Sequence, residues 1–300
     1  MNRWKTWAVV GLLLVVAGWQ LTDRVRRPGP PHRTEYLQAG DVRVRALRAG
    51  HGDTTVVLIH GFGEHLLTWR GVVDPLAADY RVIALDLPGF GGSDKPAGPY
   101  TMDAMAERVG NFLARYARPP TVLVGHSMGG AIAAEVAIRY PDLVQALVLI
   151  APAGLRVGLG PITGGMTPGR AAAIGVWEVA RAFITPLHDP EWMAEPVGMS
   201  DYDPSTDPAF RASTAKVLQD FDFTGIGERF RKIRQPTLII WGRQDPVIPY
   251  EVAQPLAKMI NCNSLVTLER TLHRPQAERP DTVVTILRHF LARPGCPETP

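Results

Sequence analysis

A series of short apolar runs, rich in β-branched residues and separated by helical patterns, most constrains the fold of this chain. The runs span residues 55–59, 81–85, 121–124, 146–150, 237–241 and 264–268. Runs that are apolar at nearly every position are typical of strands covered on both faces, as in parallel sheets. Helical patterns span residues 101–116, 127–140, 250–260 and 280–291. The alternation predicts an α/β fold with a doubly wound, mostly parallel sheet.

Residues 152–235 interrupt this alternation, because ordinary connections have only about 2–6 residues. The interval begins rich in Gly and Pro and then shows helical patterns at 170–183 and 209–221. Its large apolar side chains, including Trp177 and Trp192, favour an ordered helical cap over a disordered insert. The predicted domains are an N-terminal leader and linker (residues 1–33), an α/β core in two pieces (34–151 and 236–300) and a helical cap (152–235).

The leader contains an uncharged, apolar run at residues 7–21, flanked by basic residues. A spanning helix needs about 20 apolar residues, so this run is short. Flanking tryptophans and cations favour an uncleaved N-terminal hydrophobic helix and a membrane-anchored protein. A cleaved signal peptide, which would make the protein secreted or periplasmic, and a packed core helix remain alternatives.

Charge and cysteine content exclude other classes of function. The net charge is +3, but residues 1–33 hold six basic residues and one acid, which leaves 26 basic and 28 acidic residues elsewhere. A nucleic-acid partner is therefore not expected. Cys262 and Cys296 have no metal-ligand spacing, so no metal site is expected. Two unrelated thiols are the simpler interpretation, and a disulfide that tethers the C-terminal tail is the alternative.

The strongest chemical signal is the sequence TVLVGHSMGG at residues 121–130. A serine on a sharp turn from strand to helix presents its hydroxyl at the carboxyl edge of the sheet. Side chains two positions away would collide in such a turn, which explains Gly125 and Gly129. The amide of Met128 opens the helix, where free N–H groups favour negative charge. We therefore predict that Ser127 is a nucleophile rather than a bystander in a glycine-rich turn.

With these residues the chain resembles the α/β-hydrolase superfamily over about residues 36–292. Four further segments carry the resemblance, in the family's order: His60-Gly61-Phe62-Gly63, residues 86–94, residues 241–246 and His273-Arg274-Pro275. They are similar to the family's oxyanion loop, a structural loop, the segment of the triad acid and the histidine segment. Leu272 stands where the family often has Gly before the histidine. The resemblance implies a serine nucleophile with a helical cap domain.

The residues themselves lead to the same triad. Serine needs an adjacent base, and His273 follows the last strand, in Ser…Asp…His order. Asp245 follows a buried strand and would reach the same edge. We predict Ser127, Asp245 and His273 as catalytic residues. A solvent-facing His273 and a helix-capping Asp245 are the alternatives.

The surrounding residues are assigned supporting roles. The backbone N–H groups of Phe62 and Met128 are the predicted oxyanion donors. Asp86 and Asp94 are expected to form turns, and Glu64 and His65 to lie on a solvated loop. The residues assigned to the motifs as structural are His60, Gly61, Gly125, His126 and Gly129.

Hydrolysis of a carboxylic ester through an acyl-enzyme is the leading functional prediction. The substrate is expected to be a small hydrophobic ester-type molecule, with no cofactor. Membrane association through residues 7–21 is expected, and the oligomeric state is left open. A C–C bond hydrolase, a perhydrolase, a peptidase and a non-catalytic ligand receptor remain alternatives, although the oxyanion loop lacks the Gly-Pro-Gly continuation familiar from C–C hydrolases.

Overall fold

The computed structural model describes residues 34–155, 208–223 and 226–296. All of them belong to one compact unit of the chain. The leader with its apolar run at 7–21, and the helical pattern at 170–183 with Trp177 and Trp192, lie outside the described residues.

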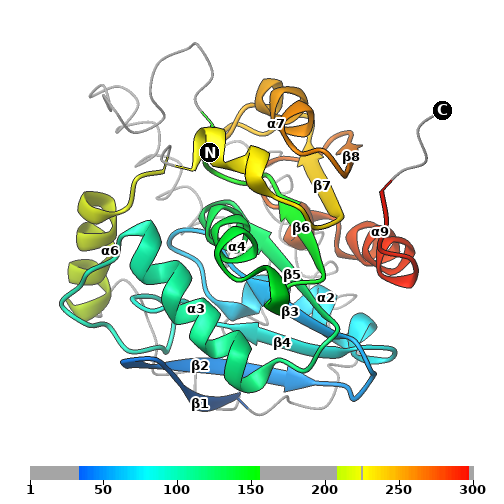
Figure 1. The fold of residues 1–300 in the computed structure, drawn as a ribbon. Helices are drawn as coiled ribbons and strands as arrows, with labels where there is room; N and C mark the ends of the chain where they lie inside the picture. Colours follow the sequence, from blue (N-terminus) through cyan, green and yellow to red (C-terminus); the bar gives the residue numbers. More distant parts are fainter. Residues whose placement is uncertain (1–33, 156–207, 224–225, 297–300) are drawn as a thin grey trace, which may run out of the picture. The chain divides into compact units, whose positions relative to one another are not determined.

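One eight-stranded sheet organises these residues (Figure 1). In chain order the strands are β1 (Thr34–Ala39), β2 (Val42–Ala49), β3 (Thr55–Ile59), β4 (Arg81–Leu85), β5 (Thr121–His126), β6 (Ala146–Ile150), β7 (Thr237–Gly242) and β8 (Asn263–Leu268). Their spatial order is β1-β2-β4-β3-β5-β6-β7-β8. The pairs β1–β2 and β2–β4 are antiparallel and the other five are parallel. The prediction of a mostly parallel sheet is confirmed.

The two faces of the sheet bury alternate residues of each strand. In β3, Val57 and Ile59 join one buried apolar cluster, whereas Val56 and Leu58 join the other. All five residues of β3 are buried. This burial on both faces explains why the strands read as continuous apolar runs rather than as alternating patterns.

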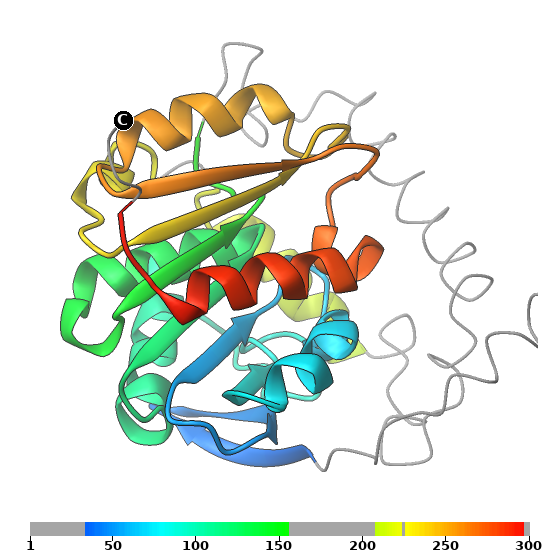
Figure 2. The same cartoon turned by 90° about the vertical axis from the view of Figure 1, so that its right-hand side faces the viewer.

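Helices cover both faces of the sheet. Apolar residues of α3 (Met102–Tyr116), α4 (Met128–Arg139) and α7 (Ala253–Met259) join the cluster that contains Val57. Those of α2 (Arg70–Ala77) and α9 (Pro280–Ala292) join the cluster that contains Val56, and both helices lie in front of the strands in Figure 2. The remaining short helices are η1 (Leu66–Trp69), η2 (Pro141–Leu143), η4 (Gly227–Lys232), η5 (Tyr250–Val252) and α8 (Pro275–Glu278).

Part of the interval at 152–235 is helical and fastened to the core. Helix α6 (Pro208–Asp220) runs where a helical pattern was predicted. The hydroxyl of Ser213 donates to the carbonyl of Gly89 at 2.6 Å, and the amide of Tyr100 donates to Asp220 Oδ2 at 3.0 Å. Two side-chain to backbone hydrogen bonds therefore hold α6 to the loop between β4 and α3.

The prediction of a membrane-anchored protein is contradicted. Across residues 34–155, 208–223 and 226–296, none of the helices has the length and apolar content needed to cross a bilayer. The run at 7–21, on which the anchor was predicted, lies outside these ranges.

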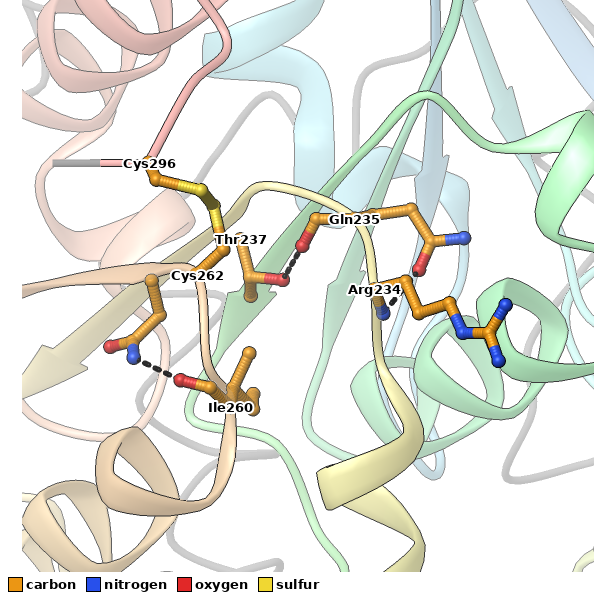
Figure 3. Close-up of a disulfide and its surroundings, with 7 residues drawn as sticks. Arg234, Gln235, Thr237, Ile260, Cys262 and Cys296 are labelled. Atoms are coloured by element: carbon orange, nitrogen blue, oxygen red, sulfur yellow. Dashed lines mark hydrogen bonds between the residues drawn. A yellow bond between two sulfur atoms is a disulfide. The ribbon is translucent and has the colours of Figure 1, made fainter.

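The two cysteines form a disulfide, so the interpretation as unrelated thiols is wrong (Figure 3). Cys262 precedes β8, and its carbonyl accepts a hydrogen bond from the amide of Thr237 at the start of β7. Cys296 follows α9, and its Cα lies 4.8 Å from that of Cys262. The bond therefore ties the segment after the last helix to the end of the sheet opposite the carboxyl ends of the parallel strands.

Candidate active site

Ser127 lies on the sharp turn between β5 and α4. Its backbone has φ 52° and ψ −120°, a left-handed conformation that is uncommon for a residue with a side chain. The turn is held by hydrogen bonds, because the Ser127 amide donates to the carbonyl of Ile150 and the Ser127 carbonyl accepts from the amide of Ala153. The surrounding structure thus sustains a strained backbone at the serine.

Two glycines make this turn possible. A Cβ at Gly125 would lie 2.3 Å from the carbonyl oxygen of Gly129. A Cβ at Gly129 would lie 2.3 Å from the carbonyl oxygen of His60. Both clashes are with backbone atoms, so the structure agrees with the steric reason that the sequence suggested for these glycines.

The structure brings Ser127, His273 and Asp245 into one hydrogen-bonded row. His273 Nε2 lies 3.0 Å from Ser127 Oγ, and His273 Nδ1 lies 2.7 Å from Asp245 Oδ2. Ser127 follows β5, Asp245 follows β7 and His273 follows β8. The carboxyl ends of these parallel strands share one edge of the sheet. Since a carboxylate oxygen accepts, Nδ1 carries the proton of a neutral ring and Nε2 accepts from the serine hydroxyl.

Backbone hydrogen bonds fix the Asp245 carboxylate. Its Oδ1 accepts from the amides of Val247 at 2.8 Å and Ile248 at 2.9 Å, which leaves Oδ2 for the imidazole. On the other side of the row, the carboxylate of Glu278 accepts from the amides of Leu272 at 2.6 Å and Arg274 at 2.8 Å. The loop that carries His273 is therefore held on both sides of the histidine, although Leu272 replaces a glycine.

His60 braces the loop between β3 and η1. The amide of Leu87 donates to His60 Nε2 at 2.9 Å, so Nδ1 carries the ring proton and donates to the carbonyl of Gly61 at 2.7 Å. Burial lowers the pKa of His60, which keeps the ring neutral. His65 in the same loop has its pKa lowered to about 4 by burial.

The acidic residues near this loop differ from the expectation. Glu64 is buried, not solvated, and its Oε2 accepts from the amide of Gly61 at 3.0 Å. Asp86 is also buried and is more than a turn former, because it accepts from the amide of Leu66 at 2.6 Å and pairs with Arg45 at 2.8 Å.

An aromatic cluster adjoins Phe62. The ring of Phe62 meets Phe90 of the loop after β4 at 5.7 Å and Phe223, which follows α6, at 5.8 Å, both edge to face. Phe210 of α6 meets Phe90 at 6.3 Å in the same way. Edge-to-face pairs are favourable beyond their buried area. Residues beside the serine turn are thus joined to α6 by apolar contacts.

Comparison with known proteins agrees with this geometry. The family model for the alpha/beta hydrolase fold matches residues 54–280. The 2-hydroxy-6-oxo-6-(2'-aminophenyl)hexa-2,4-dienoic acid hydrolase of Metapseudomonas resinovorans is 32% identical over 266 residues, which are 86% of this chain and 90% of that protein.

Two solved structures extend the comparison. One is described as a membrane phospholipase A and bacterial virulence factor; it is 28% identical, with a TM-score of 0.65 over 97% of this chain and 98% of that chain. The other, Est816, is described as an N-acyl homoserine lactone degrading enzyme; it is 26% identical, with a TM-score of 0.68 over 85% of this chain and 100% of that chain. With the family model matching most of its length, this chain belongs to the alpha/beta hydrolase fold family and is a hydrolase.

Proposed function

We propose that this hydrolase cleaves carboxylic esters through a seryl acyl-enzyme, with Ser127, His273 and Asp245 as its catalytic triad. The observation that carries the proposal is the row of two contacts, 2.7 Å and 3.0 Å, that joins the carboxylate, the imidazole and the hydroxyl. Both distances lie within hydrogen-bond reach, which is the geometry that a nucleophile and its base require.

The proposed reaction has two halves. His273 Nε2 takes the proton of Ser127 as Oγ attacks the ester carbonyl carbon, and the tetrahedral intermediate collapses when the imidazolium gives that proton to the leaving alcohol. Water then attacks the acyl-enzyme, with His273 again as base, and Ser127 is regenerated with release of the acid. Asp245 holds the productive tautomer and stabilises the imidazolium.

The backbone amides of Phe62 and Met128 are the proposed oxyanion donors. Among the described residues, no backbone hydrogen bond of the turns and loops uses either amide. Met128 is the first residue of α4, where the helix dipole favours negative charge. Donors that face a developing oxyanion each contribute on the order of 10²–10³ in rate.

Two observations favour an apolar ester as substrate. The aromatic cluster at Phe62 reaches α6, which belongs to the proposed helical cap at 152–235 of the core formed by 34–151 and 236–300. Apolar side chains line most small-molecule pockets. Two of the comparison proteins are named for a phospholipase activity and a lactone-degrading activity, and both names imply ester bonds.

The second candidate is hydrolysis of a carbon–carbon bond in a 2-hydroxy-6-oxo-hexadienoic acid. The relative from Metapseudomonas resinovorans, named as such a hydrolase, favours it. The same triad serves both reactions, so the distinction depends on the substrate pocket.

A paired experiment tests the proposal. A fluorophosphonate probe should label the wild-type protein at Ser127, and S127A should abolish both labelling and turnover. A panel of p-nitrophenyl esters, lactones and a 2-hydroxy-6-oxo-hexadienoate should show the highest kcat/KM for esters. Higher kcat/KM for the dienoate would replace the ester proposal by the second candidate. Ligand binding with no turnover and no labelling would indicate a receptor on the same fold.

A further inference from the structure

The buried carboxylate of Glu64 joins three loops of the candidate active site. Its Oε2 accepts from the amide of Gly61 at 3.0 Å and lies 3.1 Å from His126 Nδ1. Its Oε1 lies 3.3 Å from Nε of Arg274, next to His273. These contacts connect the loop that carries Phe62, the serine turn and the histidine loop. We call Glu64, His126 and Arg274 the three-loop clamp.

The ring of His126 is the centre of this clamp. Its Nε2 lies 2.8 Å from the carbonyl oxygen of His273, and the two imidazole rings are 4.8 Å apart. A Cβ at Gly61 would lie 2.9 Å from His126 Nδ1, so the glycine lets the loop that carries Phe62 lie directly against the ring. The side chain of His126 is only 1% exposed.

We propose that Glu64 and His126 are positioning residues, which set the distance between the oxyanion donor of Phe62 and the imidazole of His273. This inference rests on the proposed function. The Glu64 carboxylate holds the peptide group that precedes the one carrying the Phe62 N–H, and the Glu64 amide donates to the Gly61 carbonyl of that second peptide group at 3.3 Å. Glu64 and His126 touch no reacting atom in the proposed mechanism, and they act through the backbone of two loops that do.

Hydrogen-bond chemistry explains why glutamate suits this position. The carbonyl of His273 only accepts, so His126 Nε2 must donate to it. Glu64 Oε2 accepts from the Gly61 amide and faces His126 Nδ1, whereas Oε1 forms an ion pair with the Arg274 guanidinium. A glutamine keeps the size but has one oxygen and one NH₂ group. Whichever way the amide turns, a donor then faces either the Gly61 amide or the guanidinium, and one contact is lost.

The chain offers a matched control in Glu135. This glutamate of α4 is 1% exposed, compared with 7% for Glu64, and it also pairs with an arginine, Arg229. Burial raises the pKa of Glu135. E135Q thus removes an arginine-paired, buried carboxylate outside the clamp, and its effect measures the general cost of such a change.

The experiment compares wild type, E64Q and E135Q for kcat, KM, melting temperature and inhibition by an alkyl boronic acid, which binds Ser127 as a tetrahedral adduct. Displacement of catalytic groups by about 1 Å costs up to roughly 10²-fold in rate. We expect E64Q to lower kcat about 10- to 100-fold, to leave KM within about threefold, and to weaken boronate binding in parallel with kcat. E135Q should keep kcat and boronate affinity within about twofold of wild type.

Each outcome decides one of the two proposals. A wild-type protein that neither reacts with fluorophosphonate nor turns over ester would refute the proposed function itself. An active wild type with E64Q within twofold of its kcat, or with lost kcat but unchanged boronate affinity, would refute the clamp. If E64Q does not fold, H126N, which removes the contact of His126 Nε2 with the His273 carbonyl, is measured instead. A loss of kcat and boronate affinity in H126N would support the clamp, and wild-type values would refute it.

Discussion

Replacement of Asp245 by asparagine is the sharpest test of the proposed triad, because the structure determines how the amide must lie. In the wild type, Oδ1 accepts from two backbone amides, those of Val247 and Ile248, and Oδ2 faces His273 Nδ1. The asparagine oxygen is expected to take the position with two donors. The NH₂ group then faces Nδ1 and donates to it.

This arrangement forces the wrong tautomer on His273. With Nδ1 accepting, the ring proton moves to Nε2, which lies 3.0 Å from Ser127 Oγ and can no longer accept the serine proton. Loss of the productive tautomer costs about 10⁴ in kcat in a serine triad. That factor corresponds to about 5 kcal/mol of transition-state stabilisation.

The assay is steady-state hydrolysis of a short p-nitrophenyl ester by wild type, D245N and the control D94N. Asp94 also accepts a backbone amide, that of Arg43, and pairs with the Arg43 guanidinium, but it lies outside the triad. D245N should lose about 10⁴ in kcat with a melting temperature near that of wild type, whereas D94N should keep its kcat. A D245N protein that folds and retains more than a tenth of the wild-type kcat would refute the assigned role of Asp245.

Three further outcomes follow from the geometry. G129A should reduce labelling by fluorophosphonate at least tenfold, because its Cβ would lie 2.3 Å from the His60 carbonyl oxygen; unchanged labelling in a folded variant would contradict the steric argument. Reduction of the Cys262–Cys296 disulfide, or replacement of both cysteines by serine, should lower the free energy of unfolding by about 4 kcal/mol, because the bond closes a loop of 34 residues. Denaturant titration measures this loss, and a value under 1 kcal/mol would contradict the loop-entropy reasoning. Burial lowers the pKa of His65 to about 4, so below about pH 6.5 the unfolded chain binds a proton that the folded protein does not. The free energy of unfolding should therefore fall as the pH drops from about 6.5 to 4. Unfolding curves of H65N should show a weaker pH dependence.

The sheet could be predicted because its central strands are buried on both faces. Residues 55–59 and 146–150 were predicted with the bounds that the structure has, since their apolar runs end at turn residues. Strand β1 was not predicted. Its burial alternates between exposed and half-buried positions, and it lies at the edge of the sheet, so its sequence carries little apolar signal.

The candidate site also contains residues that could be predicted from the sequence and residues that could not. Ser127, Asp245 and His273 could be proposed together because each follows a buried strand and the carboxyl ends of parallel strands share an edge. Glu64 was assigned to a solvated loop, and its contacts with His126 and Arg274 were missed. No spacing rule links these three positions, which meet only when separate loops pack. The pairing of Cys262 with Cys296 was likewise missed in favour of two unrelated thiols, because two cysteines without further context carry no geometric information.

The neighbouring positions of β6 and β7 have a consequence for how this chain can acquire new specificities. The long excursion leaves the sheet after β6 and returns at β7, and these two strands pair directly, Leu147 with Thr237 and Ile150 with Ile240. The points where this segment leaves and rejoins the sheet are thus held side by side by backbone hydrogen bonds between β6 and β7. Exchange of the intervening polypeptide for one of another length would leave the register of both strands intact. Changes in the proposed cap can therefore be accommodated while the pairing of β6 with β7 in the core is kept.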